Sequence, residues 1–502
     1  MLSAYEGFRG GAPPLRVRAA NDRGVNSGGS FVLYWMIANR RARYNFSLNR
    51  ATAWARELGR PLVVLEALRV DYPYASERLH RFVIDGMADN QRAFADGPVL
   101  YYPYVEPYVG AGRGLLERLS ADASVIVTDD YPCFFLPQAV RAAADRVAVR
   151  LEVVDSNGLL PLAAVPQAYP AAVHHRRFMQ GALRSHLSDW PSPAPDLSSL
   201  PGRLKALPLD VTTRWPAATQ ELLSGSPVAL EALPIDHVVR PVGMRGGSRS
   251  AEVALGAFVN ERLSSYDQRH NHPDDRGTSR LSPYLHFGHI AAHHVFDAVM
   301  KHEQWTVGRL GGRPSGAREG WWGVSNPAEA FLDQLVVWRE LGFSTCAKRP
   351  HDYDRFEGLP EWAQQTLLRH ADDPRPFVYD RAAFEAGATH DPLWNAAQRE
   401  MVRDGWMHNY MRMLWGKKIL EWSASPVEAL DTMTALMNRW SLDGRDPNSY
   451  AGYMWVLGRY DRPWPERPIY GTVRSMSSES AMRKIRVARY LAESRHSGLF
   501  DR

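Results

Sequence analysis

The most constraining feature of the sequence is a change in its hydrophobic pattern near residue 190. Upstream of this point, short β-rich apolar runs alternate with helical stretches, which predicts a Rossmann-like α/β domain with a parallel sheet. The expected strands are residues 31–37, 62–68, 99–105, 124–128 and 147–154, and residues 45–58 are expected to form a helix ending at Gly59. Downstream of residue 250 the apolar spacing is helical, which predicts an all-α domain.

The segment between these regions has a composition of its own. Residues 190–202 (WPSPAPDLSSLPG) are not expected to form a regular helix, because their prolines remove donors and fix φ. We therefore predict an α/β domain (30–187), an interdomain linker that wraps the surface (188–250) and a helical domain (251–490). Residues 1–29, which include a stretch rich in Gly, Asn and Arg, are predicted to be a disordered tail, and residues 310–322 a mobile loop.

Composition excludes several classes of protein. The 502 residues are 45% apolar, but no apolar run is long enough to span a bilayer, and no secretion signal precedes the first strand. The two cysteines, Cys133 and Cys346, match no metal or disulfide framework, which predicts a cytoplasmic protein without a metal site. A net charge of +5 permits contact with a polyanion. A nucleotide-dependent dehydrogenase is disfavoured, because residues 38–41 replace the Gly-rich turn after the first strand.

One candidate anion site lies in GTSRLSPYLHFG (277–288). Thr278, Ser279 and Ser282 place three hydroxyls in a short loop, and Ser282-Pro283 predicts a helix with Ser282 as its N-cap. Hydroxyls beside a helix N-terminus suit a diphosphate. An ordinary capped helix is the alternative for this motif taken alone.

A second pattern concerns tryptophans on the helix expected at 411–422. Trp415 and Trp422 are seven residues apart, which places them two turns apart, roughly 10.5 Å along the axis. Trp394 lies upstream in HDPLWNAAQ (390–398). Indole rings at such separations can pass an electron by hopping, whereas the alternative is a tryptophan stripe that packs the core.

Two further segments carry polar groups in apolar surroundings. In LDGRDPNSYAGYMW (442–455), Asp443 and Asp446 form a rigid acidic loop, and Arg412 paired with Asp443 would suit an isoalloxazine ring. A helix-capping turn is the alternative. In AEAFLDQLVVWRELG (328–342), a tryptophan on the rim of a cavity would stack on a flipped base, and a core helix with one polar edge is the alternative. The polar residues of this helix are Asp333, Gln334, Trp338 and Arg339.

Together these segments resemble the class II cyclobutane pyrimidine dimer (CPD) photolyases of the photolyase/cryptochrome family. The ordered set RLSPYLHFG, EAFLDQLVVWRE, THDPLWNAAQREMV, MRMLWGKKILEW and DGRDPNSYAG carries the similarity through most of residues 260–480. The resemblance implies an N-terminal antenna-type domain and a C-terminal domain that binds FAD. It also implies light-driven repair of a pyrimidine dimer flipped out of damaged DNA, by a protein that we expect to be a monomer.

The resemblance further implies a role for each site residue. The residues expected to bind the cofactor are Tyr266, Thr278, Ser279, Leu281, Ser282, Arg339, Arg412, Asp443 and Asp446. The residues expected to relay electrons are Trp394, Trp415 and Trp422, in an order left open. The residues expected to receive the dimer are Trp338, Met413 and Trp455, with Gln334 acting on it. The resemblance also allows a possible second, antenna chromophore in the α/β domain, and no motif distinguishes a deazaflavin, a folate or none.

Three positions depart from the family pattern. Gln334 stands where the family has a glutamate that binds the base, and an amide cannot supply an acidic proton. Met437 replaces an asparagine close to the reactive flavin nitrogen, with Asn438 beside it, and Ser449 replaces a glycine. Two hypotheses follow: dimer repair at reduced efficiency, or a cryptochrome-like photoreceptor that keeps FAD and the tryptophans but has weakened or lost repair.

Overall fold

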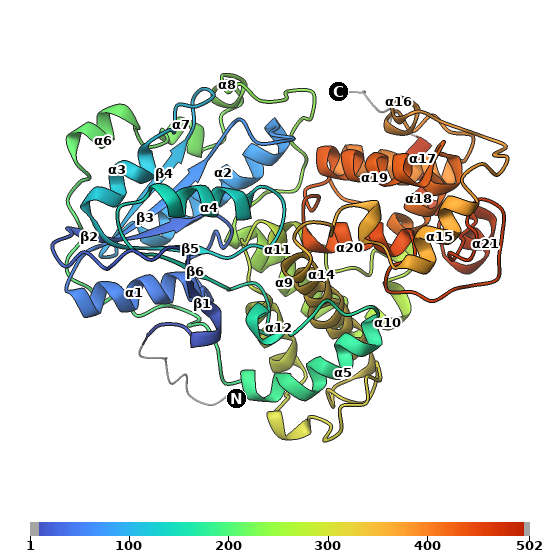
Figure 1. The fold of residues 1–502 in the computed structure, drawn as a ribbon, viewed down its shortest axis with the longest axis horizontal. Coiled ribbons are helices and arrows are strands. Elements are labelled where there is room, and N and C mark those ends of the chain that lie inside the picture. The colour runs from blue at the N-terminus through green and yellow to red at the C-terminus, as the bar shows by residue number, and fades with distance from the viewer. Residues whose placement is uncertain (1–9, 496–502) are drawn as a thin grey trace.

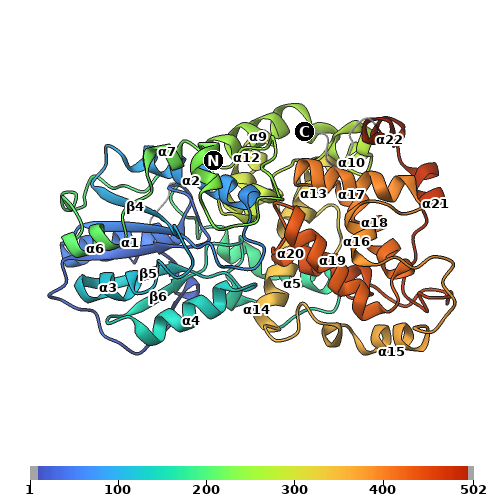
Figure 2. The ribbon, with the colours of Figure 1, turned by 90° about the horizontal axis from the view of Figure 1, so that it is seen from above.

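Residues 10–495 are described by a computed structural model, in which an α/β lobe and a helical lobe lie side by side (Figure 1, Figure 2). The predicted combination of a parallel sheet with an all-α domain is confirmed. Within residues 10–495, no helix combines the length and the apolar character that crossing a membrane requires.

The α/β lobe is built on a six-stranded sheet of order β1-β6-β5-β2-β3-β4. β1 is antiparallel to β6, and every other pairing is parallel. The inner strands are almost continuously apolar because helices cover both faces of the sheet. The strands are β1 (Val17–Ala19), β2 (Phe31–Met36), β3 (Leu62–Leu68), β4 (Val99–Val105), β5 (Ala123–Asp129) and β6 (Leu151–Val154).

Helices on opposite faces bury the two sides of this sheet. The helix α1 (Phe46–Leu58) begins at Asn45, whose side-chain oxygen accepts the Leu48 amide at 3.2 Å, and ends at Gly59 with φ 62°, as the sequence predicts. α1 and the end of α2 (Glu77–Phe94) pack on one face. α3 (Leu115–Asp122) and α4 (Leu136–Arg146) pack on the other.

The predicted disordered tail is wrong for residues 10–29. A 3-10 turn at Pro14–Arg16 leads into β1, which pairs with β6. The buried Arg16 side chain donates to the carbonyls of Gly158 (3.0 Å) and Leu159 (2.8 Å). One arginine that bridges distant carbonyls orders a segment whose composition alone looks unstructured. Residues 1–9 lie outside the described residues.

The connecting segment divides between the two lobes. α5 (Ala172–Ala182) packs with the helical lobe, since Met179 shares a core with Phe258, although we predicted the α/β domain to run to residue 187. Residues 197–233 instead cover the α/β lobe: Trp215 packs against the α3 face, and Leu223 packs with α2. The helices of this stretch are α6 (Leu209–Arg214), α7 (Gln220–Leu223) and α8 (Pro227–Glu231).

The helical lobe contains the remaining helices. Residues 310–322 are irregular, as predicted, but Trp321 and Trp322 are buried. The helices are α9 (Ser248–Glu261), α10 (Tyr266–Arg269), α11 (Ser282–His286), α12 (Ala292–His302), α13 (Asn326–Leu332), a π-helical segment (Asp333–Trp338), α14 (Arg339–Lys348), α15 (Glu361–Arg369), α16 (Arg381–Glu385), α17 (Pro392–Asp404), α18 (Asn409–Trp422), α19 (Pro426–Trp440), α20 (Pro447–Val456), α21 (Ser478–Lys484) and α22 (Ala488–Arg495).

The turn after β2 shows why a dinucleotide does not bind there. The Asp129 carboxylate at the end of β5 accepts the backbone amides of Ile37, Ala38 and Asn39 at 2.9, 2.8 and 2.9 Å. These are the donors that a pyrophosphate would need in a Gly-rich turn. An acidic side chain already occupies them, which supports the exclusion of a dehydrogenase.

The two lobes are joined through the loop that follows β6. Glu340 of α14 accepts the backbone amides of Leu159 and Leu160 at 2.6 and 3.1 Å, and Arg339 donates to the Asn157 carbonyl at 2.6 Å. A β-carbon on Gly158 would lie 2.7 Å from Cδ of Glu340. The helical lobe therefore approaches this loop so closely that only glycine fits at position 158 without a shift of Glu340.

Replacing Gly158 by alanine is expected to lower the free energy of unfolding by about 2 kcal/mol, because the buried Glu340 has no room to retreat. Urea titration of the whole protein measures the effect. Gly202→Ala is the matched control, since nothing lies within 4 Å of its new β-carbon. Equal stability of the two variants would show that the lobes do not depend on this close approach.

Glu340 also predicts a pH dependence. Burial raises its pKa to about 7 from the ordinary 4.5, although two amide hydrogen bonds act to lower it. Between these values the folded chain binds a proton that the unfolded chain releases, so stability falls as pH rises, by about 3 kcal/mol over the window. Glu340→Gln is expected to remove this slope when urea midpoints at pH 5 and pH 8 are compared.

Two comparisons make that measurement specific. Burial raises the pKa of Glu400 to about 7 as well, so the Glu340→Gln variant keeps the part of the slope that comes from Glu400 and loses only the part that comes from Glu340. The variant must therefore be compared with the parent and with a variant of the exposed Glu261, Glu261→Gln. A Glu340→Gln protein with the parent slope would contradict the assignment.

Candidate functional site

A cavity of about 400 Å³ lies in the helical lobe, where four segments far apart in the sequence meet. These segments are the loop around residue 280, the helix through residue 335, the start of α18, and the loop and helix that begin at residue 443. The predicted site residues that line the cavity are Tyr266, Thr278, Ser279, Ser282, Gln334, Trp338, Arg339, Arg412, Met413, Asp443, Asp446 and Trp455. Twelve of the predicted residues are therefore brought together.

The hydroxyl-bearing side of the cavity differs in detail from the prediction. α11 starts at Ser282, and Leu281 occupies the N-cap position without a side-chain cap, so the expected Ser282 cap is wrong. The Ser282 side chain instead lies beside the Asp443 carboxylate and helps to lower the pKa of that group. The Leu281 side chain is buried in the core and does not line the cavity.

Arg412 and Asp443 form the predicted ion pair. The Nη2 atom of Arg412 lies 3.0 and 3.1 Å from the two carboxylate oxygens. Burial acts to raise the pKa of Asp443, but the Arg412 charge and the hydrogen bonds from Ser282 and Ser441 outweigh it and hold the pKa below its ordinary value. The Nε atom of Arg412 is buried and has no hydrogen-bond partner among the described residues, so this wall has a donor available for a polar ligand.

The second carboxylate of the loop has a different use. Asp446 is the N-cap of α20, where its side chain accepts the Asn448 amide at 2.8 Å. It also accepts the Tyr131 hydroxyl at 3.0 Å. The alternative of a helix-capping turn thus holds for Asp446, whereas Asp443 pairs with Arg412.

The helix through residue 335 presents two side chains to the cavity. Gln334 and Trp338 line it and are only partly buried, and the Gln334 amide makes no hydrogen bond within residues 10–495. Asp333 is directed elsewhere, because its carboxylate pairs with Arg176 of α5 at 2.8 Å. Arg339 touches the cavity, but its guanidinium stacks on Phe343 and donates to Asn157. Gln334 and Trp338 are therefore the residues of this helix that are free to contact a ligand.

The three predicted relay tryptophans form one continuous stack behind the cavity. The Trp394 ring lies 6.3 Å from the Trp415 ring, at an interplanar angle of 5°. It lies 6.0 Å from the Trp422 ring on its other side, at 66°. All three are at most 2% exposed, and none lines the cavity. Trp394, from α17, therefore stands between two rings of α18, an order that sequence spacing alone does not give.

Sequence reasoning missed part of the cavity wall. Trp406 lines it and lies under the Arg280 guanidinium, 4.6 Å from the ring centroid. Neither position belongs to a periodic pattern, although Gly405 before Trp406 marks the end of α17. Of the departing residues, Ser449 lines the cavity, and its hydroxyl donates to the Asp443 carbonyl at 2.7 Å.

The third departing residue, Met437, and its neighbour Asn438 do not line the cavity. Met437 is fully buried in the core. The Asn438 side chain accepts the Arg445 amide at 2.8 Å and thereby holds the acidic loop. Asn438 is therefore committed to the loop and does not compensate for Met437.

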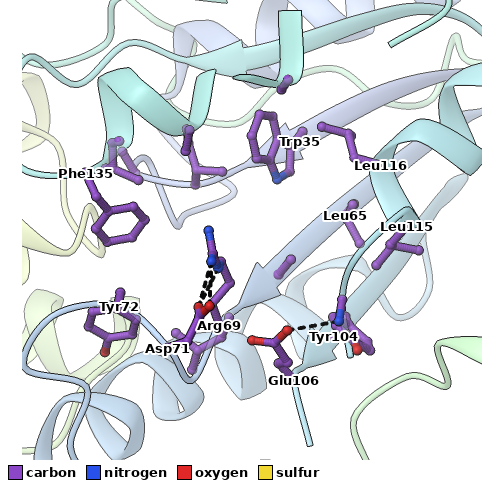
Figure 3. Close-up of a pocket in the computed structure, with 18 of the residues that line it drawn as sticks. Trp35, Leu65, Arg69, Asp71, Tyr72, Tyr104, Glu106, Leu115, Leu116 and Phe135 are labelled. Carbon is purple, nitrogen blue, oxygen red and sulfur yellow. Dashed lines mark hydrogen bonds and ion pairs between the residues drawn. The ribbon is translucent and has the colours of Figure 1, made fainter. Parts of the chain in front are cut away.

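A larger cavity, of about 900 Å³, lies at the carboxyl ends of β2, β3 and β4, against the helical lobe. Figure 3 shows Trp35, Tyr72 and Phe135 around this space and the Arg69–Asp71 ion pair within it, whose two hydrogen bonds are both 2.8 Å. Crevices at the carboxyl ends of parallel strands are common ligand sites. The Tyr131–Asp446 hydrogen bond joins the walls of the two cavities.

Comparison with known proteins shows the family. No family model matches the chain. A deoxyribodipyrimidine photo-lyase of Methanothermobacter thermautotrophicus is 34% identical over 489 residues, which cover 97% of this chain and 99% of the relative. This chain belongs to the photolyase/cryptochrome family. A deoxyribodipyrimidine photo-lyase of rice is 33% identical, over 95% of this photolyase-family chain and 90% of the relative.

Solved structures share the photolyase fold. A class III photolyase from Agrobacterium tumefaciens superposes with a TM-score of 0.67 at 17% identity, over 93% of this chain and 86% of that one. An archaeal photolyase from Sulfolobus tokodaii, described as holding two FAD molecules, superposes with a TM-score of 0.62 at 14% identity. The latter comparison covers 92% of this photolyase-family chain and 89% of that one.

Proposed function

We propose that this photolyase-family protein is a deoxyribodipyrimidine photo-lyase that repairs cyclobutane pyrimidine dimers in DNA with light absorbed by bound FAD. The observation that carries the proposal is the meeting of the hydroxyl loop, the Arg412–Asp443 pair and a base-stacking wall in one cavity, with three stacked tryptophans behind it. Together with the motif pattern, these features favour class II.

FAD fits the polar groups of the helical-lobe cavity. Thr278, Ser279 and Ser282 would hold its diphosphate and ribityl hydroxyls, and the unpartnered Arg412 Nε with Asp443 would bind the polar edge of the ring. When bound, reduced and excited by light, FAD supplies the electron that splits the dimer. The chain's part is to orient the ring and to keep water from it.

The substrate side of the cavity would receive a dimer flipped out of the duplex. Trp338 and Trp455 offer flat faces for stacking, and Met413 fills the space between such faces with an adaptable apolar side chain. Gln334, whose amide is free, would hydrogen-bond a base edge. These four residues would fix the dimer without contributing a charge.

The three tryptophans would carry an electron towards the cavity when FAD enters in its oxidised form. Because Trp394 stands between the others, the order would be Trp422, Trp394, Trp415. The Trp394 indole donates to the Trp415 carbonyl at 3.0 Å, and the Trp415 indole donates to Gln398 at 3.0 Å. These bonds fix the ring positions that hopping requires.

A second chromophore would occupy the larger cavity. Its aromatic wall and its volume of about 900 Å³ suit a planar light-absorbing molecule, and the Arg69–Asp71 pair offers polar contacts. The Sulfolobus tokodaii relative is described as holding two FAD molecules. Reconstitution with a deazaflavin, a folate and FAD, followed by fluorescence energy transfer to the first flavin, distinguishes the candidates.

A cryptochrome-like photoreceptor is the second candidate function. The observation in its favour is that Gln334 lines the substrate cavity in place of the expected glutamate, while Met437 lies in the core and Asn438 holds a loop. Both functions would be expected of a monomer in the cytoplasm, an environment that two free, buried cysteines fit.

Absorption and repair assays test the proposed function. Purified protein is expected to be yellow or to take up added FAD, and to restore a thymine-dimer oligonucleotide under blue light with a reductant. Bound flavin that is reduced by light without repair would favour the photoreceptor. Colourless protein that takes up no flavin would overturn both.

Replacing Gln334 by glutamate is expected to raise the repair yield per absorbed photon about fivefold, because a carboxyl group makes a stronger hydrogen bond to the base than an amide does. The measurement is dimer repair against absorbed dose for the variant and the parent. Gln268→Glu, at an exposed position of α10, adds the same charge outside the cavity. An unchanged yield in Gln334→Glu would count against the role of this residue.

A further inference from the structure

Three tryptophans other than those of the relay line the flavin cavity itself: Trp338, Trp406 and Trp455. Under the proposed function, an oxidised flavin excited by light takes an electron from the neighbouring group that gives it most readily. Indoles on the cavity wall would compete with the relay, whose members lie behind the wall. Trp406 and Trp455 differ from the relay rings in the cations that lie near them.

Trp455 has an uncompensated cation against it. The Lys417 ammonium lies 5.0 Å from its ring centroid, is fully buried, and donates to the Val456 carbonyl. Among residues 10–495, no carboxylate forms an ion pair with Lys417. A second cation, Arg474, lies 5.7 Å from the same ring, but Asp461 pairs with it at 2.9 Å. The net charge next to Trp455 is therefore that of Lys417.

Trp406 has the same arrangement. The Arg280 guanidinium lies 4.6 Å from its ring centroid. Arg280 makes neither a hydrogen bond nor an ion pair with any residue in the described range. Its backbone φ of 58° lies in the left-handed region, which is uncommon for an arginine. Two of the three cavity tryptophans thus each face one positive charge that no carboxylate neutralises.

The relay tryptophans differ in this respect. Within the described structure no lysine or arginine lies over the rings of Trp394 or Trp415. Lys418 lies 5.3 Å from the Trp422 ring, but Glu421 pairs with it at 2.8 Å. Loss of an electron leaves a positive charge on an indole. The buried Lys417 opposes that charge strongly, and the exposed Arg280, whose charge water screens, opposes it less. Oxidation is therefore less opposed along the relay than at Trp455 and Trp406.

We propose that Lys417 and Arg280 act as electrostatic guards, which prevent Trp455 and Trp406 from reducing the photoexcited flavin and so direct oxidation to the relay. The inference rests on the proposed function. One electron would pass from Trp415 to bound flavin, one from Trp394 to Trp415 and one from Trp422 to Trp394, and a thiol reductant in solution would return one electron to Trp422. Lys417 and Arg280 are positioning residues, because neither gives nor takes an electron.

The guard at Trp455 is sensitive to pH. Burial lowers the pKa of Lys417 to about 7, with Asp461 raising it and Arg474 lowering it. Tyr470, which donates to the Lys417 carbonyl, and Glu421, which pairs with Lys418, are the other titratable groups at this position. The charge of Lys417 is therefore present in acid and is lost as pH rises above about 7.

Mapping of light-induced tryptophan oxidation tests the proposal. FAD-loaded protein is illuminated in blue light without a thiol, digested, and analysed by mass spectrometry for oxidised tryptophan at each position. Lys417→Met is expected to raise the product at Trp455 about tenfold. Arg280→Gln is expected to raise the product at Trp406 about twofold, because Arg280 is exposed and water screens its charge. In the parent protein, the product at Trp455 is expected to rise between pH 6 and pH 8.5, and that at Trp406 is not.

Two references make the measurement specific. Trp338 lines the cavity with no cation over its ring in the described structure, so its product should be the same in every variant. Lys418→Met removes the neighbouring lysine, whose charge is paired, and should leave Trp455 unchanged. The two guards are tested separately. If Lys417→Met fails to fold, Arg280→Gln, at an exposed position, still tests the proposal.

The outcomes separate this inference from the function on which it rests. One outcome would overturn the guards alone. In it, Trp422 is oxidised in light, but the product at Trp455 does not rise in Lys417→Met and the product at Trp406 does not rise in Arg280→Gln. Protein that binds no FAD and forms no product at Trp422 would overturn the proposed function and the guards together.

Discussion

Trp394→Phe is expected to slow the light-driven reduction of bound flavin by about two orders of magnitude, because the gap between Trp415 and Trp422 then becomes a single step of roughly 10.5 Å. In the parent protein, Trp394 divides this gap into contacts of 6.3 and 6.0 Å between ring centroids. Phenylalanine keeps most of the packing but is much harder to oxidise. The measurement is the rate of flavin bleaching in blue light with a thiol present.

A control variant separates electron transfer from packing. Trp305 is buried in the other core of the helical lobe, where its indole donates to the Trp322 carbonyl. Trp305→Phe removes a similar volume far from the stack and should leave the rate of photoreduction unchanged. Both variants should bind FAD as the parent does. A Trp394→Phe protein that bleaches at the parent rate would show that electrons take another route.

Arg412→Gln is expected to weaken FAD binding by about 10- to 100-fold, because a charge-assisted hydrogen bond from a buried guanidinium is replaced by that of a neutral amide. Asp443 then lacks the charge that lowers its pKa, so burial raises that pKa and the ion pair no longer holds this wall of the cavity. Fluorescence titration of the apoprotein with FAD gives the dissociation constant. The same titration with riboflavin shows whether the loss concerns the ring or the diphosphate.

The matched control for this change is Arg381→Leu, at an exposed position of α16. It removes one positive charge outside the cavity and should leave the affinity for FAD unaltered. Circular dichroism should show that both variants are folded at the temperature of the titration. An Arg412→Gln protein with the parent affinity would mean that the ion pair only supports the loop at residue 443.

The sequence predicted the regular part of the fold because that part depends on local pattern. Strands β2, β3 and β4 are apolar runs buried on both faces, and α1 is bounded by the Asn45 cap and Gly59. The parts of the fold that the sequence could not predict depend on contacts between residues that are distant in the chain. Residues 10–29 are ordered by Arg16, whose partners lie about 140 residues away. α5 joins the helical lobe for a similar reason, since its Arg176 pairs with Asp333.

The same difference between local pattern and distant contacts explains which parts of the candidate site could be predicted. The motifs supplied twelve residues that line one cavity, because each motif has a recognisable local form. The prediction that Ser282 caps α11 was wrong, because its side chain lies beside the Asp443 carboxylate of a distant loop. Trp406 was missed because an isolated tryptophan after a helix end has no periodic signature. Which side chains meet is a tertiary property that spacing along one helix does not contain.

The interleaving of Trp394 between two rings of α18 makes the relay a product of tertiary structure. A peptide with the α18 sequence carries only the two outer indoles, and any opening between α17 and α18 of a few ångström breaks the path. Under the proposed function, bleaching of bound flavin by blue light would therefore report whether these two helices are docked. The same signal would follow refolding or partial unfolding in real time without an added label.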